Sequence, residues 1–304
     1  MDATTGRPPA TCRLASALPV IAVLGSMVSL GIGTSFAKTL FPLAGPEGTT
    51  FIRVGLAALI LSAIHRPWRG RATRAGAGPI LLYGAAIAGM NLLFYKALET
   101  LPFGLALAIE FVGPLSIAIF ASRRWIDLFW AMLALAALAL LLPIGSHVSI
   151  DHRGAGFALA AAVCWAVYIL VGRHAGRAGN RAVASGMTVA ALLVAPFGAG
   201  HLNAGLLAPA ILATAIGIAI LSSVIPYSLE MVALTRLPRR VFGILVSLEP
   251  AIGAVAALAV LGEHLSGRQW IAIAAVVIAS AGSTAMAADR GEAAEGSAAD
   301  LPPP

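Results

Sequence analysis

Long apolar segments alternate with short polar ones along almost the whole chain. Windows of about twenty residues, the length that crosses a bilayer as a helix, pick out such segments. Ten are found, at residues 19–38, 49–65, 78–98, 103–121, 125–143, 154–173, 182–199, 208–230, 239–261 and 268–287. The pattern predicts an all-α polytopic membrane protein with ten transmembrane helices.

Two stretches of the chain repeat each other at a constant separation. Ala97, Leu98, Leu101, Pro102 and Pro114 recur as Ala233, Leu234, Leu237, Pro238 and Pro250, with 233 − 97 = 136 and 250 − 114 = 136. Ten spans in two copies leave five per copy, and an odd number makes the second copy enter from the opposite side. We therefore expect two inverted five-helix repeats, at residues 18–145 and 150–288, as is typical of secondary transporters.

Basic residues gather in short clusters between the apolar segments. With the N-terminus in the cytoplasm, fifteen of the twenty Lys and Arg residues lie in segments predicted on the inner side. The positive-inside rule thus predicts that both termini are cytoplasmic. We expect residues 1–17 to form a cytoplasmic N-terminal tail. Residues 289–304 are acidic, Ala-rich and Pro-terminated, and we expect them to form a disordered cytoplasmic tail.

Composition excludes several other classes of protein. Hydrophobic residues make up 59% of the chain and charged residues 11%, whereas soluble domains carry about a quarter charged residues. The net charge of +7 does not indicate nucleic-acid binding, because the arginines lie in interspan clusters. Cys12 and Cys164 fit neither a disulfide framework nor a metal-ligand spacing. Without a phosphate-binding lysine loop, an HExxH motif or a nucleophile elbow, we expect no enzyme, cofactor or metal site.

Two glutamates lie at membrane depth. Glu110 is four residues before Pro114, whose missing N–H leaves the carbonyl of Glu110 without its helical partner, and Glu249 directly precedes Pro250. Helical rise places each acid about 12 to 14 Å into a core about 30 Å thick. An acid there costs about 2.5 to 3.5 kcal/mol, so we expect both to face one polar pocket between the repeats. Each could instead bond to a neighbouring helix as polar glue.

Two further charges lie within predicted spans. Glu230 precedes Arg236 by six residues and either serves the pocket or pairs and snorkels at the interface. In the same span, Pro226 removes the helical partner of the Ser222 carbonyl, which predicts a kink. Arg53 could bind a substrate carboxylate through two hydrogen bonds, or serve as a structural or snorkelling arginine.

Polar and aromatic residues occur on the spans that flank the acids. Each one alone also fits helix packing or an interfacial belt, but together they favour a pocket with hydrogen-bonding groups and aromatic walls. They are Asn91, Tyr95, Trp165, Tyr168 and Tyr227.

Several motifs resemble those of one family. The threonine and homoserine exporter branch of the drug/metabolite transporter superfamily, whose repeat unit is the EamA-type five-helix module, has similar motifs over nearly the whole chain apart from the tails. The motifs are SFAKTLFP, FIRVGL, GMNLLFYKALETLPFGLALAIEFVGPL, SRR, CWAVYIL, PYSLEMVALTRLPRRVFGILVSLEP and LGEHL.

This resemblance implies a ten-helix carrier in the bacterial inner membrane that exports amino acids in exchange for protons. It also implies a central substrate cavity, lined by Asn91, Tyr95, Glu110, Trp165, Tyr168, Tyr227, Glu230 and Glu249. Lys96 and Glu99 stand where milder polar residues are expected in that branch, so the substrate is left open.

The leading hypothesis is therefore proton-coupled export of a small neutral amino acid resembling threonine or homoserine. Glu110 or Glu249 would bind the substrate ammonium or the coupling proton in turn. The alternatives are an exporter of a hydrophobic cation, a purine or a related metabolite, a non-transporting membrane scaffold or sensor, and an intramembrane transferase.

Overall fold

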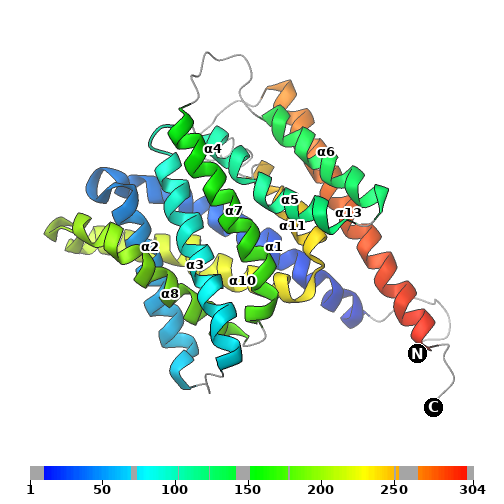
Figure 1. The fold of residues 1–304 in the computed structure, drawn as a ribbon, viewed down its shortest axis with the longest axis horizontal. Helices are drawn as coiled ribbons and strands as arrows, with labels where there is room; N and C mark the ends of the chain where they lie inside the picture. The colour runs from blue at the N-terminus through cyan, green and yellow to red at the C-terminus, as the bar shows by residue number, and fades with distance from the viewer. Residues whose placement is uncertain are drawn as a thin grey trace.

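The apolar segments fold into a bundle of helices in a computed structural model of the chain (Figure 1). The structure describes residues 10–69, 74–101, 103–122, 124–141, 151–176, 179–249, 251–252 and 266–299. Within these residues all regular secondary structure is helical. Six of their helical segments are long and apolar enough to cross a membrane by length and composition.

These six segments provide most of the bundle. They lie in α1 (Ala10–Ala37), α2 (Phe41–His65), α3 (Arg74–Ala97), α7 (His152–Ala175), α8 (Asn180–Gly198), and the run of α9 (Pro209–Ala219), η6 (Ile220–Val224) and α10 (Ile225–Arg236). The other helices are α4 (Phe103–Glu110), α5 (Val112–Ala121), α6 (Trp125–Leu141), α11 (Arg239–Val246) and α13 (Gly267–Ala299). Short turns join some of them, at η1 (Lys38–Leu40), η2 (Pro67–Arg69), η4 (Ala199–His201) and η5 (Ala204–Leu207).

The distribution of polarity is that of a membrane protein. Large apolar side chains cover the outside; Leu59 and Leu192, for example, are 68% and 69% exposed. Charged side chains such as Arg53 and Glu110 are buried instead. This arrangement is unfavourable in water but suits a bilayer, because lipid solvates apolar side chains while helices satisfy their own backbone groups. The predicted all-helical, multi-pass membrane protein is therefore confirmed.

Helices from the two halves of the chain pack in pairs. The helix α3 packs along α7, α1 against α10, α2 along α8, α5 against α11 and α6 beside α13. In Figure 1, α2, α3 and α8 lie together on one side, whereas α6 and α13 share the opposite edge. The helices α1, α7 and α10 lie between these groups, and half of the buried polar or charged residues described come from this middle region and from the adjoining α2 and α3.

Prolines break two helices at matching places. The helix α4 ends at Glu110, four residues before Pro114, and α11 ends at Val246, four residues before Pro250. Since proline has no N–H, the carbonyl four residues earlier loses its helical partner. The helical segment from Phe103 to Ala121 is therefore divided where the sequence places its acid.

The turn η6 is π-helical, and it changes one prediction. A π-turn pairs each carbonyl with the N–H five residues later, and for Leu221 that residue is Pro226, which has none. The Ser29 hydroxyl on α1 donates to the Leu221 carbonyl instead, at 2.6 Å. The sequence predicted a free carbonyl at Ser222, but the carbonyl that receives a side-chain hydrogen bond from Ser29 is that of Leu221, one residue earlier.

Helices extend into both segments that were predicted to be tails. Helix α1 begins at Ala10, inside the segment expected to be an N-terminal tail, and α13 continues to Ala299, past the predicted start of a disordered tail at Asp289. The segment after Asp289 is rich in alanine, the residue with the highest helix propensity, which accounts for the helix. Ten of the 23 residues of the predicted ninth span, residues 239–261, lie outside the described residues, so the count of ten spans stays a prediction.

Candidate functional site

A set of buried polar side chains lies where α2, α3, α4, α7 and α10 approach one another. Arg53 of α2 is 3% exposed, and its Nη1 atom donates a hydrogen bond to the hydroxyl of Tyr95 on α3, at 3.1 Å. The guanidinium also lies over the Tyr95 ring, 5.1 Å from its centroid, which is a cation–π contact. Arg53 is twelve residues past the start of α2 at Phe41.

A second hydrogen bond joins α3 to α10. The Nδ2 atom of Asn91 donates to the hydroxyl of Tyr227 at 2.7 Å and to its own-helix carbonyl of Ile87 at 2.8 Å. Both residues are at most 5% exposed, so this amide fixes the Tyr227 hydroxyl in the interior of the bundle. Tyr227 also lies within electrostatic range of Arg53, Glu230 and Glu110, which places it between the charged residues.

The acid of α10 is held by a tyrosine of α7. The Tyr168 hydroxyl donates to Oε2 of Glu230 at 2.8 Å, and Ser26 of α1 lies beside the same carboxylate. The Tyr168 ring stacks on Tyr83 at 5.1 Å and meets Tyr227 edge-on at 5.9 Å. Glu230 is therefore a partnered interior acid, as a hydrogen-bonded buried carboxylate should be.

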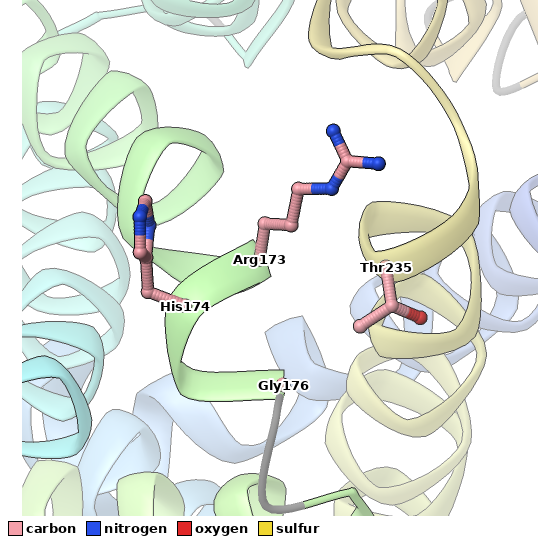
Figure 2. A pocket seen from close by; sticks show the side chains of 4 residues that line it. All are labelled: Arg173, His174, Gly176 and Thr235. Atoms are coloured by element: carbon pink, nitrogen blue, oxygen red, sulfur yellow. The ribbon is translucent and has the colours of Figure 1, made fainter. Parts of the chain in front are cut away.

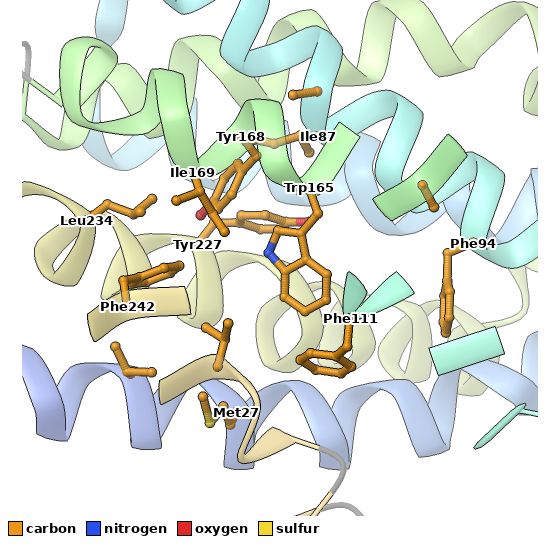
Figure 3. Close-up of a cluster of buried hydrophobic side chains, with 14 of the residues drawn as sticks. Met27, Ile87, Phe94, Phe111, Trp165, Tyr168, Ile169, Tyr227, Leu234 and Phe242 are labelled. Atoms are coloured by element: carbon orange, nitrogen blue, oxygen red, sulfur yellow. The ribbon is translucent and has the colours of Figure 1, made fainter. Parts of the chain in front are cut away.

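Trp165 has a different neighbourhood. Its ring packs on Phe111 at 4.8 Å, next to the break between α4 and α5. Figure 3 shows Trp165, Tyr168 and Ile169 of α7 on the side of Tyr227 of α10, with the Trp165 ring beside Phe111. Trp165 thus forms part of the aromatic wall beside the polar residues.

Glu110 differs from the other interior acid because no described residue donates a hydrogen bond to its carboxylate. The residue is 5% exposed at the end of α4, and its carboxylate lies within electrostatic range of Glu249 and Arg53. Glu249 follows α11 and is partly exposed, with Glu230 within electrostatic range of it. The structure therefore brings Glu110 close to a cation and to a second acid.

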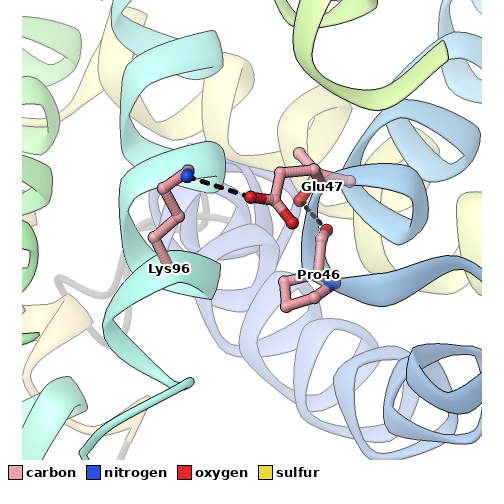
Figure 4. A network of polar contacts seen from close by, with 4 residues as sticks. Pro46, Glu47 and Lys96 are labelled. Carbon is pink, nitrogen blue, oxygen red and sulfur yellow. Dashed lines mark hydrogen bonds and ion pairs between the residues drawn. The ribbon is translucent and has the colours of Figure 1, made fainter. Parts of the chain in front are cut away.

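An ion pair joins α2 to α3 near the C-terminal end of α3. Lys96, near the end of α3, forms an ion pair with Glu47 of α2 at 2.9 Å (Figure 4). Glu47 follows a kink in α2 at Gly45, whose φ of 64° lies in the left-handed region that favours glycine. The ion pair gives a structural explanation for Lys96, one of the two charges that departed from the expected family pattern.

A surface pocket lies at the C-terminal end of α7 (Figure 2). It is lined by Arg173, His174, Gly176 and Thr235. None of the predicted cavity residues lines this pocket, so it is separate from the polar interior. Within the described residues, no group of three or more His, Cys, Asp or Glu side chains is arranged to hold a metal ion.

Comparison with known proteins gives the family. The chain is 47% identical over 279 residues to the threonine/homoserine exporter RhtA of Salmonella typhimurium (strain LT2), covering 91% of this chain and 95% of that protein. It is 46% identical over 269 residues to the threonine/homoserine exporter RhtA of Escherichia coli (strain K12), covering 88% and 91%. A family model described as the EamA-like transporter family matches residues 152–285. The chain belongs to the EamA-like transporter family.

The fold of this EamA-like transporter is also found in a solved structure. A crystal structure of a protein aligns with a TM-score of 0.75 over 90% of this chain and 98% of its own, at 19% identity. At this identity the likeness concerns the fold alone. The named relatives are exporters rather than enzymes, and the resemblance inferred from the sequence motifs is confirmed.

Sequence reasoning missed three interior groups of this EamA-like transporter. Thr49 lies one helical turn before Arg53, and its hydroxyl is buried without a hydrogen-bond partner. Ser26 and Tyr83 border the Tyr168–Glu230 pair. The spacing of Thr49 and Arg53 was a usable signal, because residues four apart share one face of a helix. Ser26 and Tyr83 carried no such signal, since their neighbours are far away in the sequence.

Proposed function

We propose that this protein exports small neutral amino acids of the threonine and homoserine type across the bacterial inner membrane, by exchange with protons. The observation that carries the proposal is the similarity, over nearly the full length of both proteins, to transporters named for threonine and homoserine. A buried set of acids, an arginine and hydroxyl groups is the chemistry that a zwitterion with a hydroxyl side chain requires.

The chain acts, in this proposal, as ten spans in two inverted repeats with both termini in the cytoplasm. The helix pairs support it: α2 with α8 and α6 with α13 join equivalent helices, and α5 with α11 join opposite halves of the equivalent fourth and ninth spans. The pairs α1 with α10 and α3 with α7 exchange under a twofold axis. The Asn91–Tyr227 hydrogen bond joins positions at the repeat offset, since 227 − 91 = 136. The breaks at Glu110 and Val246 share that offset, since 246 − 110 = 136.

Glu110 is the proposed point of exchange. A buried carboxylate without a hydrogen-bond donor is costly, and it can be neutralised by a proton or by a bound ammonium group. Only one of these can occupy the carboxylate at a time, so ammonium binding would release the proton. Glu249 is the second proton-coupling candidate, because it shares the electrostatic environment of Glu110.

The remaining cavity candidates would shape this chamber. Asn91 and Tyr227 link α3 to α10, Tyr168 holds Glu230, and Trp165 supplies an apolar wall. Movement of one repeat against the other would then expose the same site to the two sides in turn, which is the transport mechanism associated with inverted repeats.

Transport by purified protein in sealed vesicles tests the proposal. With an imposed proton gradient, we expect accumulation of labelled threonine and homoserine, but not of 1-aminopropan-2-ol, the amine that remains when threonine loses its carboxylate. Loss of accumulation when the gradient is collapsed is the expected control result. Equal transport of the amine would instead favour a cation exporter, and binding without any transport would favour a scaffold.

A further inference from the structure

Arg53 is a buried cation without a carboxylate partner. It is 3% exposed, and no carboxylate of the described residues forms an ion pair with it. A buried charge normally has a partner, because taking it out of water without one costs several kcal/mol. The described protein therefore leaves Arg53 without a directly bonded anion.

The geometry of the guanidinium shows which edge is open. Tyr95 accepts the hydrogen bond from Nη1 and covers one face of the group with its ring. The Nε atom is fully buried and has no hydrogen-bond partner. The Nε and Nη2 donors lie on the same edge of an arginine, and this edge matches the two oxygens of a carboxylate.

A hydroxyl group lies one turn away on the same helix. The Oγ1 atom of Thr49 is buried and has no hydrogen-bond partner. Its neighbour Thr50 behaves as helical threonines usually do, since its hydroxyl donates to the Pro46 carbonyl at 2.8 Å. Because Thr49 and Arg53 are four residues apart, both open donors lie on one face of α2.

An acid lies on the other side of this region. Glu110 is within electrostatic range of Arg53, and Tyr227 is within range of both. A small amino acid carries its carboxylate and ammonium on one carbon atom, so it requires an anion-binding and a cation-binding group close together. Arg53 and Glu110 provide these two charges.

We propose that the Nε–Nη2 edge of Arg53, with the Thr49 hydroxyl, binds the α-carboxylate of the exported amino acid. Tyr95 is then a positioning residue: it holds Nη1 and the plane of the guanidinium, and it does not contact the substrate. This inference rests on the proposed function, and it gives the transporter a basis for rejecting amines and esters that lack a free carboxylate.

The test uses the full-length protein in sealed vesicles and measures how unlabelled competitors inhibit labelled threonine transport. In the wild type, threonine should compete at least tenfold better than 1-aminopropan-2-ol or threonine methyl ester. Arg53→Lys keeps the positive charge but loses the Nε–Nη2 edge with its two parallel donors, so this preference should fall at least tenfold. Tyr95→Phe should weaken the preference less, because it removes only the hydrogen bond that positions Nη1.

A matched pair of threonines tests the proposal without touching a charge. Thr49→Val should raise the threonine concentration needed for half-maximal transport about three- to tenfold, whereas Thr50→Val should leave it unchanged; the factor corresponds to one hydrogen bond. This inference would be overturned if Arg53→Lys kept the wild-type preference and Thr49→Val kept the wild-type concentration for half-maximal transport. By contrast, a wild-type protein that transports neither threonine nor homoserine would refute the proposed function itself.

Discussion

Two interior acids of this transporter lie in contrasting surroundings. Glu230 of α10 receives a hydrogen bond from Tyr168, and Ser26 lies beside it. Glu110 at the end of α4 receives no hydrogen bond from the described residues and lies near the charges of Arg53 and Glu249. The comparison teaches that burial alone does not identify a transport residue, because a partnered acid is already stabilised by the protein.

The difference also separates structural from functional polarity. The Tyr168–Glu230 bond ties α7 to α10, and α10 is tied to α3 through Asn91 and Tyr227. The first bond lies within the second half of the chain, and the second joins that half to the first. The region of Glu110 and Arg53 has open donors and an open acceptor, which is the condition for binding a ligand that supplies the missing partners.

Replacing Glu110 should give the largest effect. In Glu110→Gln, the site can no longer exchange a proton for an ammonium group, so gradient-driven export should fall at least tenfold while the folded protein remains. Transport in vesicles with and without the gradient measures the change. Unfolding temperature in detergent is the control, and wild-type export by this variant would assign Glu110 to structure.

Removing the partner of Glu230 should mainly affect stability. Tyr168→Phe leaves a buried carboxylate without its donor, which costs about 1 to 3 kcal/mol and should lower the unfolding temperature by several degrees. Tyr83→Phe is the matched control, because the Tyr83 hydroxyl is buried without a hydrogen-bond partner. Equal unfolding temperatures for the two variants would contradict the claim that the Tyr168 hydrogen bond stabilises Glu230.

The packing of α1 against η6 bears on the comparison of the two acids, because η6 leads directly into α10, the helix that carries Glu230. A Cβ atom at Gly33 would lie 2.6 Å from the Ser222 backbone nitrogen, whereas one at Gly31 would meet nothing within 4 Å. Overpacking of this kind costs about 1 to 3 kcal/mol. Gly33→Ala should therefore unfold at a lower temperature than Gly31→Ala, and equal unfolding temperatures would argue against this close approach.

The smallest effect on stability is expected for Asp151, an acid outside the membrane-spanning segments. The pKa of Asp151 is lowered by a hydrogen bond from Thr100 and by the backbone N–H of Arg153, which Asp151 caps at the start of α7. Its contribution is present above the pKa of the unfolded chain and is lost as the pH falls through the lower, folded-state pKa. Asp151→Ala should slightly lower the unfolding temperature at neutral pH. A thermal melt in acid should show no such difference, whereas a difference that grows in acid would contradict this role.

The sequence predicted the all-helical, multi-pass membrane protein, because the length of an apolar segment is a local signal. Glu110, Pro114 and the repeat offset were also readable, and the break of α4 falls at the predicted residue. The partners of the acids were not predictable, since Tyr168 and Glu230 are 62 residues apart. The hydrogen bond that Ser29 donates to the Leu221 carbonyl in the π-turn was not predictable either, since these residues are 192 apart.

The most direct test of the central claim is the number of protons released when threonine binds to the purified transporter in weakly buffered detergent solution. If Glu110 exchanges a proton for the substrate ammonium, the wild type should release protons in proportion to the threonine bound, and Glu110→Gln should release none. Threonine binding to the wild type without proton release, or equal release by both proteins, would contradict the account.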